Sequence, residues 1–254
     1  MSNNKSVPAL KRAHRIMTAL LHSPVPLGIS ALARELDLSK STVHGLVHTL
    51  TDMRLIEPVS DNGRGLQPGR VVLDLWREAL LKGALARAAG PLLTAFTARH
   101  GLTGLAGVFL VSKVLVVEAA LAPGFGVAAY RGQMVPSWAA ALGKALLAVL
   151  PPERAGRLAR TLSAQGPLDL PAYLMEVESA RVRGAALDRE EYLPGVRAVA
   201  AAIPPAGPLE PIGAVWAVGL APSLDEERLL SLVPEVRALA DAVGRRAAEL
   251  DGRT

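Results

Sequence analysis

The chain has 254 residues, half of them hydrophobic, which is enough for two domains that each bury a core. It contains no cysteine, which excludes disulfides, thiolate metal sites and a cysteine nucleophile. The net charge is +5, and residues 1–70 hold nine Lys and Arg against five Asp and Glu, so most of the excess positive charge lies in this segment. We therefore expect residues 1–70 to face a polyanion.

Three short helices are predicted within the first fifty residues. The N-terminus lacks the apolar core of a secretory signal, and Pro8 suits the first turn of a helix that ends near Ser23. Ser30 is predicted to cap a second helix that runs to Leu36, and Ser39 to cap a third. The third helix has a stripe of apolar residues that we expect to face inward: Val43, Leu46, Val47 and Leu50.

Polar, hydrogen-bonding side chains occupy the start and the outer face of the third predicted helix. A recognition helix needs an apolar back for packing and a donor-rich front for base edges and phosphates. Its free N–H groups would add a phosphate site. The residues predicted to bind DNA from this helix are Ser39, Lys40, Ser41, Thr42, His44 and His48.

A β-hairpin is predicted directly after this helix. Residues 55–59 have the composition of a short strand, and Asn62-Gly63 is the strongest two-residue hairpin signal. Arg64 stands beside the tip, so Asn62 and Arg64 are predicted to reach a minor groove or the phosphate backbone. Each of these residues alone would more often be an ordinary surface residue, but together they predict a winged helix-turn-helix domain over residues 1–70.

Residues 71–89 are predicted to form a linker helix, because the stretch from Gly69 to Ala88 is amphipathic. The apolar run from Leu102 to Leu121 is interrupted by Lys113 and Glu118 and is rich in Val and Gly, so it predicts paired strands rather than a membrane span. We expect a soluble, cytoplasmic protein. In the domain predicted over residues 90–254, helices (92–100, 143–150, 152–162, 225–250) alternate with strands (106–111, 114–119, 212–218).

Three segments resemble the IclR family of bacterial transcriptional regulators. They are LARELDLSKSTVHGLVHTLTDMRLIE in the predicted DNA-binding domain, GQMVPSWAAALGKALLAVLP and RGAALDREEYLPGVRAVAAAIPP. The resemblance implies an α+β protein with an N-terminal winged helix-turn-helix, a linker helix and a C-terminal GAF-like α/β effector domain built on an antiparallel sheet. It also implies a homodimer or homotetramer on a double-stranded DNA operator. We expect this regulator to act as a repressor whose affinity for DNA a small-molecule effector modulates.

The resemblance also implies an effector site, and here the chain departs from the family. Asp188 matches the family's aspartate, and backbone amides near Ala141 and Leu142 would complete the site. Ala198 stands where the family carries cysteine, and Trp216 and Val218 stand where it carries two serines. A carboxylate buried among these side chains would lose its hydration for few hydrogen bonds, so we expect an effector that is larger or more apolar. The alternative is that Trp216 fills the pocket and the domain is a ligand-free oligomerisation scaffold of an architectural DNA-binding protein.

Two further departures lie in the DNA-binding domain. Gly45 occupies a position where the family usually has arginine, and Leu66 one where tyrosine is common. Gly45 removes a side chain that would contact DNA and weakens the helix interior. Both change the expected details of operator recognition.

An enzyme is not expected. Beyond residue 70 the chain has one histidine, His100, and no cysteine, so neither a histidine-based metal site nor a cysteine nucleophile is predicted, and no cofactor is expected. Asp188, Glu190 and Glu191 suggest a solvated acidic turn or a helix N-terminus rather than acid–base catalysis. Gly143-Lys144 lacks the remainder of a phosphate-binding loop, so Lys144 is predicted to be a helix-surface or structural charge.

Overall fold

A computed structural model describes residues 7–23, 25–59, 65–110, 113–124, 130–138, 140–164, 169–203 and 212–252. Residue contacts divide the chain into two compact units, with the boundary between Ala79 and Leu80. We call these the N-terminal unit and the C-terminal unit. Among the described residues, no helix combines the length and hydropathy that a membrane span requires.

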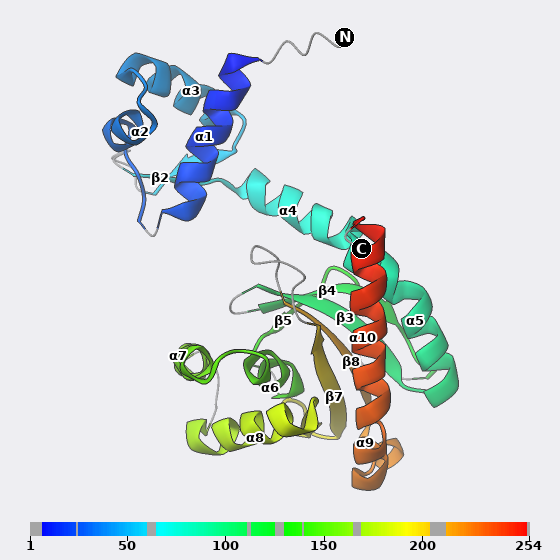
Figure 1. The fold of residues 1–254 in the computed structure, drawn as a ribbon. Helices are drawn as coiled ribbons and strands as arrows, with labels where there is room; N and C mark the ends of the chain where they lie inside the picture. The colour runs from blue at the N-terminus through cyan, green and yellow to red at the C-terminus, as the bar shows by residue number, and fades with distance from the viewer. Residues whose placement is uncertain are drawn as a thin grey trace. The chain divides into compact units, whose positions relative to one another are not determined.

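The N-terminal unit is a small helical domain with a two-stranded sheet (Figure 1). β1 and β2 are antiparallel, with Ile56 opposite Pro68 and Pro58 opposite Leu66. One apolar core joins the three helices to this sheet and includes Ile16, Leu32 and Val47. The elements are α1 (Pro8–His22), α2 (Ile29–Leu36), α3 (Lys40–Asp52), β1 (Ile56–Pro58), β2 (Leu66–Pro68) and the start of α4 (Arg70–Lys82).

The helix starts test three of the predictions. α1 begins at Pro8, and the Ser39 side chain accepts a hydrogen bond of 3.1 Å from the Thr42 N–H, so both of these predictions are confirmed. The predicted Ser30 cap is wrong: α2 begins at Ile29, and Gly28 is its N-cap residue. Gly28 has extended backbone and its carbonyl accepts from the N–H groups of Ala31 and Leu32, which places Ser30 inside the first turn.

The predicted linker helix is two helices. α4 ends at Lys82 and α5 (Ala84–His100) begins one residue later. Gly83 lies between them with extended backbone (φ −69°, ψ 174°) and serves as the N-cap of α5. Extended backbone at one residue interrupts the helical hydrogen-bond ladder, so α5 starts a new helix rather than continuing α4.

The described strands of the C-terminal unit form a six-stranded sheet in the order β5-β4-β3-β8-β7-β6, with all neighbours antiparallel. β3 and β4 pair with each other, which confirms the paired strands predicted for residues 102–121. β5, β6 and β7 were not predicted. The strands are β3 (Thr103–Leu110), β4 (Lys113–Ala120), β5 (Met134–Pro136), β6 (Ala186–Arg189), β7 (Val196–Ile203) and β8 (Gly213–Leu220).

Helices cover both faces of this sheet (Figure 1). α5 and α10 pack on one face, and α6 and α8 on the other, with α7 against α6 and α8. The helix predicted over 225–250 is divided at Leu232, and α8 was not predicted. The remaining helices are α6 (Ala140–Ala148), α7 (Pro152–Ser163), α8 (Leu170–Arg183), a 3-10 turn (Ala221–Ser223), α9 (Glu226–Ser231) and α10 (Val233–Leu250).

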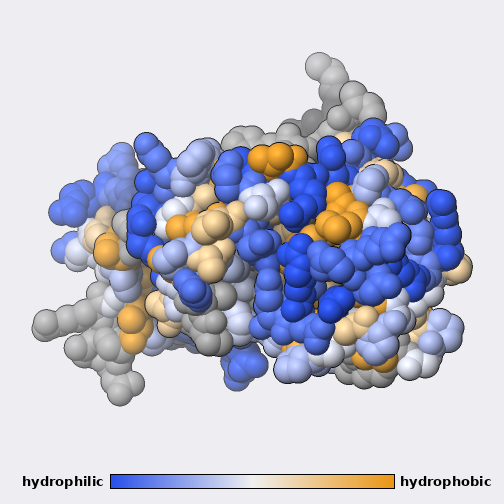
Figure 2. Space-filling view, turned by 90° about the horizontal axis from the view of Figure 1, so that it is seen from below, coloured by the Kyte–Doolittle hydropathy of each residue, from blue (hydrophilic) through white to orange (hydrophobic). Residues whose placement is uncertain are grey.

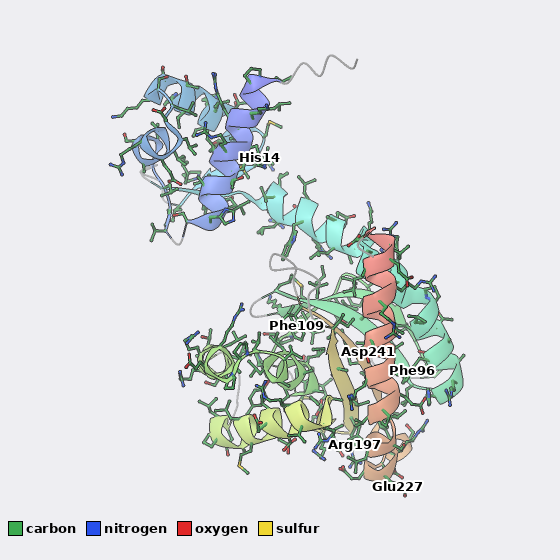
Figure 3. The ribbon with its side chains drawn as sticks, viewed as in Figure 1. His14, Phe96, Phe109, Arg197, Glu227 and Asp241 are labelled. Atoms are coloured by element: carbon green, nitrogen blue, oxygen red, sulfur yellow. The ribbon has the colours of Figure 1, made fainter. Side chains whose placement is uncertain are left out.

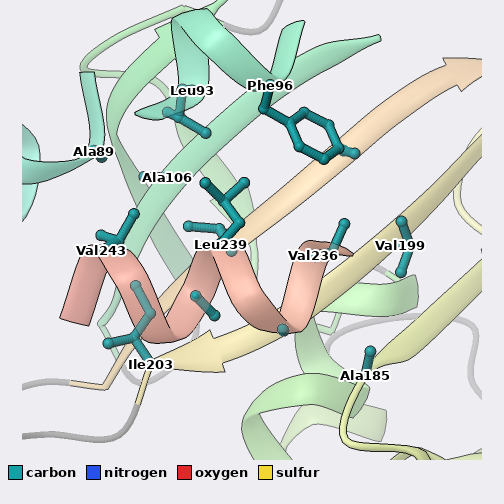
Figure 4. Close-up of a cluster of buried hydrophobic side chains, with 14 of the residues drawn as sticks. Ala89, Leu93, Phe96, Ala106, Ala185, Val199, Ile203, Val236, Leu239 and Val243 are labelled. Atoms are coloured by element: carbon teal, nitrogen blue, oxygen red, sulfur yellow. The ribbon is translucent and has the colours of Figure 1, made fainter. Parts of the chain in front are cut away.

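The sheet therefore separates two hydrophobic cores. Figure 4 shows the first, in which Leu93 and Phe96 of α5 meet Leu239 of α10 over the strands. Phe109 belongs to the second core, which lies under α6, α7 and α8 (Figure 3). On the face shown in Figure 2, small groups of hydrophobic residues are separated by hydrophilic ones. Burial on both faces of the sheet explains why its strands have nearly continuous apolar sequences.

Candidate DNA-binding face and effector site

The start of α3 carries the first group of predicted DNA-binding residues. The Ser39 hydroxyl lies 3.0 Å from that of Ser41 and 2.8 Å from that of Thr42, and it also caps the helix. The Ser39 hydroxyl therefore hydrogen-bonds the side chains of both Ser41 and Thr42. Lys40 is exposed and is the cation of this turn.

His44 and His48 lie on the exposed face of α3, one turn apart, as predicted. Sequence reasoning missed Asp52, whose Oδ2 lies 3.0 Å from Nδ1 of His48. Both side chains are exposed, so water and salt screen their attraction. The carboxylate gives this end of the face a negative charge, while Lys40 gives the other end a positive one.

The tip of the predicted hairpin, with Asn62 and Arg64, lies outside the described residues. Its base is described: the Val59 N–H donates to the Gly65 carbonyl at 2.9 Å, beside the paired strands β1 and β2. This pairing confirms the hairpin. Leu66 is buried in the core of the N-terminal unit, so this position packs inward.

Gly45 lies in the middle of the exposed face of α3, and a Cβ placed on it would meet no atom within 4 Å. Gly45→Ala is therefore expected to raise the free energy of unfolding by about 1 kcal/mol, because glycine loses more backbone entropy in a helix. Chemical denaturation measures this. Gly101→Ala is the control: its Cβ also has open space, but its φ of +65° penalises a side chain, so stability should fall. A loss of stability in Gly45→Ala would contradict this reading of α3.

The predicted effector residues come together on the sheet face that α6 and α8 cover. Asp188 pairs with Ala198, and Ala198 pairs with Val218, so the three lie in one row across β6, β7 and β8. Trp216 lies in the next row of the same face, opposite Ala200. Ala141 and Leu142 of α6 belong to the same buried cluster. All six residues are buried, which the sequence did not reveal.

Asp188 is 5% exposed and lies in a strand, so the predicted solvated turn or helix N-terminus is wrong for this residue. Burial above all, together with the nearby Glu191 carboxylate, raises the pKa of Asp188 to about 6. Hydrogen bonds from backbone N–H groups, including that of Glu191 at 2.8 Å, oppose this shift. Asp188 is therefore a buried carboxyl group whose pKa lies closer to neutral pH than that of an ordinary aspartate.

Lys144 is a buried structural charge, so the helix-surface alternative is wrong. Its side chain is 1% exposed, and its Nζ lies 2.6 Å from Oε2 of Glu191. The pair connects α6 to the loop that follows β6. A buried ammonium group is costly unless it is paired, so the ion pair with Glu191 offsets part of the cost of burying Lys144.

The loop after β6 is held in an uncommon conformation. Glu190 has a φ of +69°, which side-chain-bearing residues rarely adopt. Its carboxylate accepts hydrogen bonds of 3.0 Å from the Gly195 N–H and 3.1 Å from Nε of Arg197, a residue labelled in Figure 3. These bonds fix the backbone on which Glu191 approaches Lys144. Strain of this kind is often stored at functional sites.

Sequence reasoning also missed Tyr173 of α8. The side chain is 7% exposed, and its hydroxyl has no hydrogen-bond partner among the described residues. A Cβ on Gly143 would lie 2.1 Å from this hydroxyl and 2.4 Å from the Ser137 carbonyl oxygen, so α6 and α8 approach closely here. Burial, and then the Glu191 carboxylate, raise the pKa of Tyr173 above its usual value. No motif in the sequence indicates this residue.

Comparisons with known proteins match both units. The model of the IclR helix-turn-helix domain matches residues 9–60, and that of the bacterial transcriptional regulator IclR C-terminal domain matches residues 79–245. The chain is 30% identical to a glycerol operon regulatory protein of Streptomyces coelicolor over 95% of this chain and 96% of that protein. It resembles the crystal structure of the Agrobacterium tumefaciens repressor BlcR, with 25% identity, a TM-score of 0.56 and coverage of 95% and 98%. A putative transcriptional regulator from Rhodococcus has 21% identity, a TM-score of 0.61 and coverage of 96% and 100%.

Proposed function

Because the chain belongs to the IclR family of bacterial transcriptional regulators, we propose that it binds an operator through α3 and the hairpin over residues 56–68. The observation that carries this proposal is the exposed face of α3, where Lys40, His44 and His48 lie on the side opposite the core. A helix with one apolar, buried side and one polar, exposed side suits the major groove. The hairpin would supply Asn62 and Arg64 at its tip. The chain is a transcriptional regulator and not an enzyme.

Substitutions of the two cations test this assignment. Lys40→Ala and Arg64→Ala are each expected to weaken binding to DNA from the promoters of neighbouring genes, because each removes a phosphate contact. Each should also reduce the slope of log K against the logarithm of the salt concentration by about one. Gel-shift titrations at several salt concentrations measure both effects.

Lys113→Ala is the matched control, because it removes the same charge from an exposed position of the C-terminal unit. It should leave the affinity and the salt dependence close to those of the unchanged protein. If Lys40→Ala and Arg64→Ala both bind as Lys113→Ala does, the assignment of helix and wing is wrong.

The C-terminal unit is proposed to bind a small-molecule effector over Asp188, Ala198, Val218 and Trp216. An effector that binds one DNA-binding state better than the other would shift operator affinity by that difference. The apolar row beside Asp188 supports a ligand that is larger or more apolar than glyoxylate. Calorimetric titration with small carboxylates tests this, and micromolar binding would refute it.

A second candidate is a ligand-independent DNA-binding protein with a C-terminal scaffold. The burial of Ala198, Trp216 and Val218, each below a tenth exposed, favours it. The two candidates differ in one measurement, namely whether any small molecule changes the affinity for DNA.

Repression, oligomerisation and location complete the proposal. The similar Agrobacterium protein is named a repressor, which supports repression here.

The described side chains of α4 include no buried residue, and Leu73, Leu75 and Trp76 are exposed, which supports association with a second copy. Light scattering tests whether the protein is a dimer or a tetramer. A regulator of this kind would act in the cytoplasm, where its operator is.

A further inference from the structure

A groove between α5 and α10 lies away from both sites described above. Its volume is about 370 Å³, within the range of about 300–1,000 Å³ that is usual for small-molecule pockets. α5 and α10 pack together on the face of the sheet opposite α6 and α8, so the sheet separates the groove from the predicted effector residues (Figure 1). The residues that line the groove are Leu92, Ala242, Arg245, Arg246, Glu249 and Leu250.

The apolar residues of the groove leave hydrocarbon surface in contact with water. Leu92 packs against the core that includes Leu93 and Phe96, and it is only partly buried there. Ala242 is also partly buried, and Leu250 is 44% exposed. A ligand with an apolar chain would cover this surface, and each methylene group that it buries would favour binding.

Two cations complete the lining. Arg245 and Arg246 are exposed, and neither guanidinium group has an ion pair or a hydrogen bond among the described residues. Glu249 lies one turn after Arg245 on α10, but no ion pair in the described part of the chain joins it to either arginine. By contrast, Arg189 and Arg197 of the same unit are paired with glutamates. The two guanidinium groups of the groove are therefore available to an anion from solution.

The charges of the groove select the head group of the ligand. Two arginines and one glutamate give the lining a net charge of +1. A carboxylate carries one negative charge, and a guanidinium group can bind it with two parallel hydrogen bonds. A phosphate ester carries close to two negative charges, and an amine would be repelled by both arginines. The net charge therefore favours a carboxylate.

We propose that the groove between α5 and α10 binds a carboxylate with an apolar chain. Arg245 and Arg246 hold the carboxylate group, and the chain lies along Leu92, Ala242 and Leu250. This inference goes beyond the proposed function, because it assigns a second ligand site that needs neither DNA nor the residues on the other face of the sheet.

Four probes separate the contribution of the charge from that of the chain: octanoate, octan-1-ol, octylamine and glyoxylate. Octanoate has both features, octan-1-ol and octylamine keep the chain without the negative charge, and glyoxylate keeps the charge without the chain. Calorimetry on the full-length protein should show octanoate binding about tenfold more tightly than each of the others. Absence of octanoate binding, or equal or tighter binding of any other probe, overturns the proposal.

Arg245→Gln combined with Arg246→Gln is the decisive variant. It should weaken octanoate binding about tenfold, since the hydrogen bonds from both charged groups are lost. Its melting temperature should stay close to that of the unchanged protein, because neither guanidinium group has a partner within the described ranges. Unchanged affinity for octanoate in this variant would place the ligand elsewhere, including the opposite face of the sheet, and overturns the proposal.

Arg154→Gln combined with Arg157→Gln is the matched control, because it removes two exposed arginines from α7, on the other face of the sheet. This variant should bind octanoate as the unchanged protein does. An equal loss of affinity in the control would show a general effect of charge, and that result also overturns the assignment of the groove.

A second copy of the chain is the other candidate occupant of the groove. Calorimetry and light scattering at two protein concentrations test it, since the affinity of an open groove for octanoate should not depend on protein concentration. A fall in affinity as the mass of the assembly rises would show that a second copy covers the groove, which overturns the proposal.

Gel shifts with promoter DNA test the proposed function separately. A protein that binds DNA but no octanoate contradicts this inference alone. A protein that binds octanoate but no DNA contradicts the proposed function alone.

Discussion

Glu191→Gln is expected to lower the free energy of unfolding by about 3 kcal/mol, because it removes the carboxylate with which the buried ammonium group of Lys144 forms an ion pair. The Lys144 side chain is 1% exposed, so water cannot replace the lost carboxylate without a local rearrangement. Glu191 itself is partly exposed, which places the expected loss at the lower end of the range for broken buried pairs. Denaturant titration followed by tryptophan fluorescence measures it, since Trp138 and Trp216 both lie in this unit.

A double variant separates the charge effect from packing. Lys144→Met keeps most of the side-chain length and removes the charge, so Lys144→Met combined with Glu191→Gln should be more stable than Glu191→Gln alone. If the double variant is less stable than Glu191→Gln, the loss does not come from an uncompensated charge. Equal stability of Glu191→Gln and the unchanged protein would contradict the buried ion pair.

Gly143→Ala is expected to lower the free energy of unfolding by about 2 kcal/mol. The added methyl group would lie 2.1 Å from the Tyr173 hydroxyl oxygen and 2.4 Å from the Ser137 carbonyl oxygen. The second contact involves backbone, which cannot turn aside as a flexible side chain would. The same denaturant titration measures this loss.

Combining Gly143→Ala with Tyr173→Phe provides the control. Removing the hydroxyl relieves one of the two contacts, so the double variant should recover part of the lost stability while the contact with Ser137 remains. Unchanged stability of the single Gly143→Ala variant would show that α6 and α8 do not approach as closely as described.

Much of the N-terminal unit follows from local sequence signals. Pro8 at a helix start, Ser39 as a cap and the apolar stripe of α3 all act within a few residues of the backbone that they shape. Ser30 failed as a cap because Gly28, two residues earlier, already has the extended backbone that ends the preceding segment. Local signals therefore predict which elements exist better than they predict where each begins.

The C-terminal site was less accessible to sequence reasoning. The resemblance indicated Asp188, Ala198, Trp216 and Val218, and strand register aligns the first, second and fourth of these in one row. Lys144 could not be assigned, because a lysine on a helix is usually exposed and only the fold brings Glu191 to it from 47 residues away. Tyr173 was missed because α8 has weak amphipathic character, so its buried face is not evident in the sequence.

The amino-acid sequence by itself determined the class of this protein: a helix with an apolar back and a polar front, a hairpin after it, and a second, cysteine-free domain. These features depend on short-range spacing, which fixes backbone geometry directly. Only the tertiary structure decided the chemistry of the second domain, where Lys144 of α6 pairs with Glu191 and the Glu191 N–H donates to Asp188 of β6. The physical reason is that burial and charge pairing depend on which distant segments pack together, and these set the cost of each ionised or unpaired group.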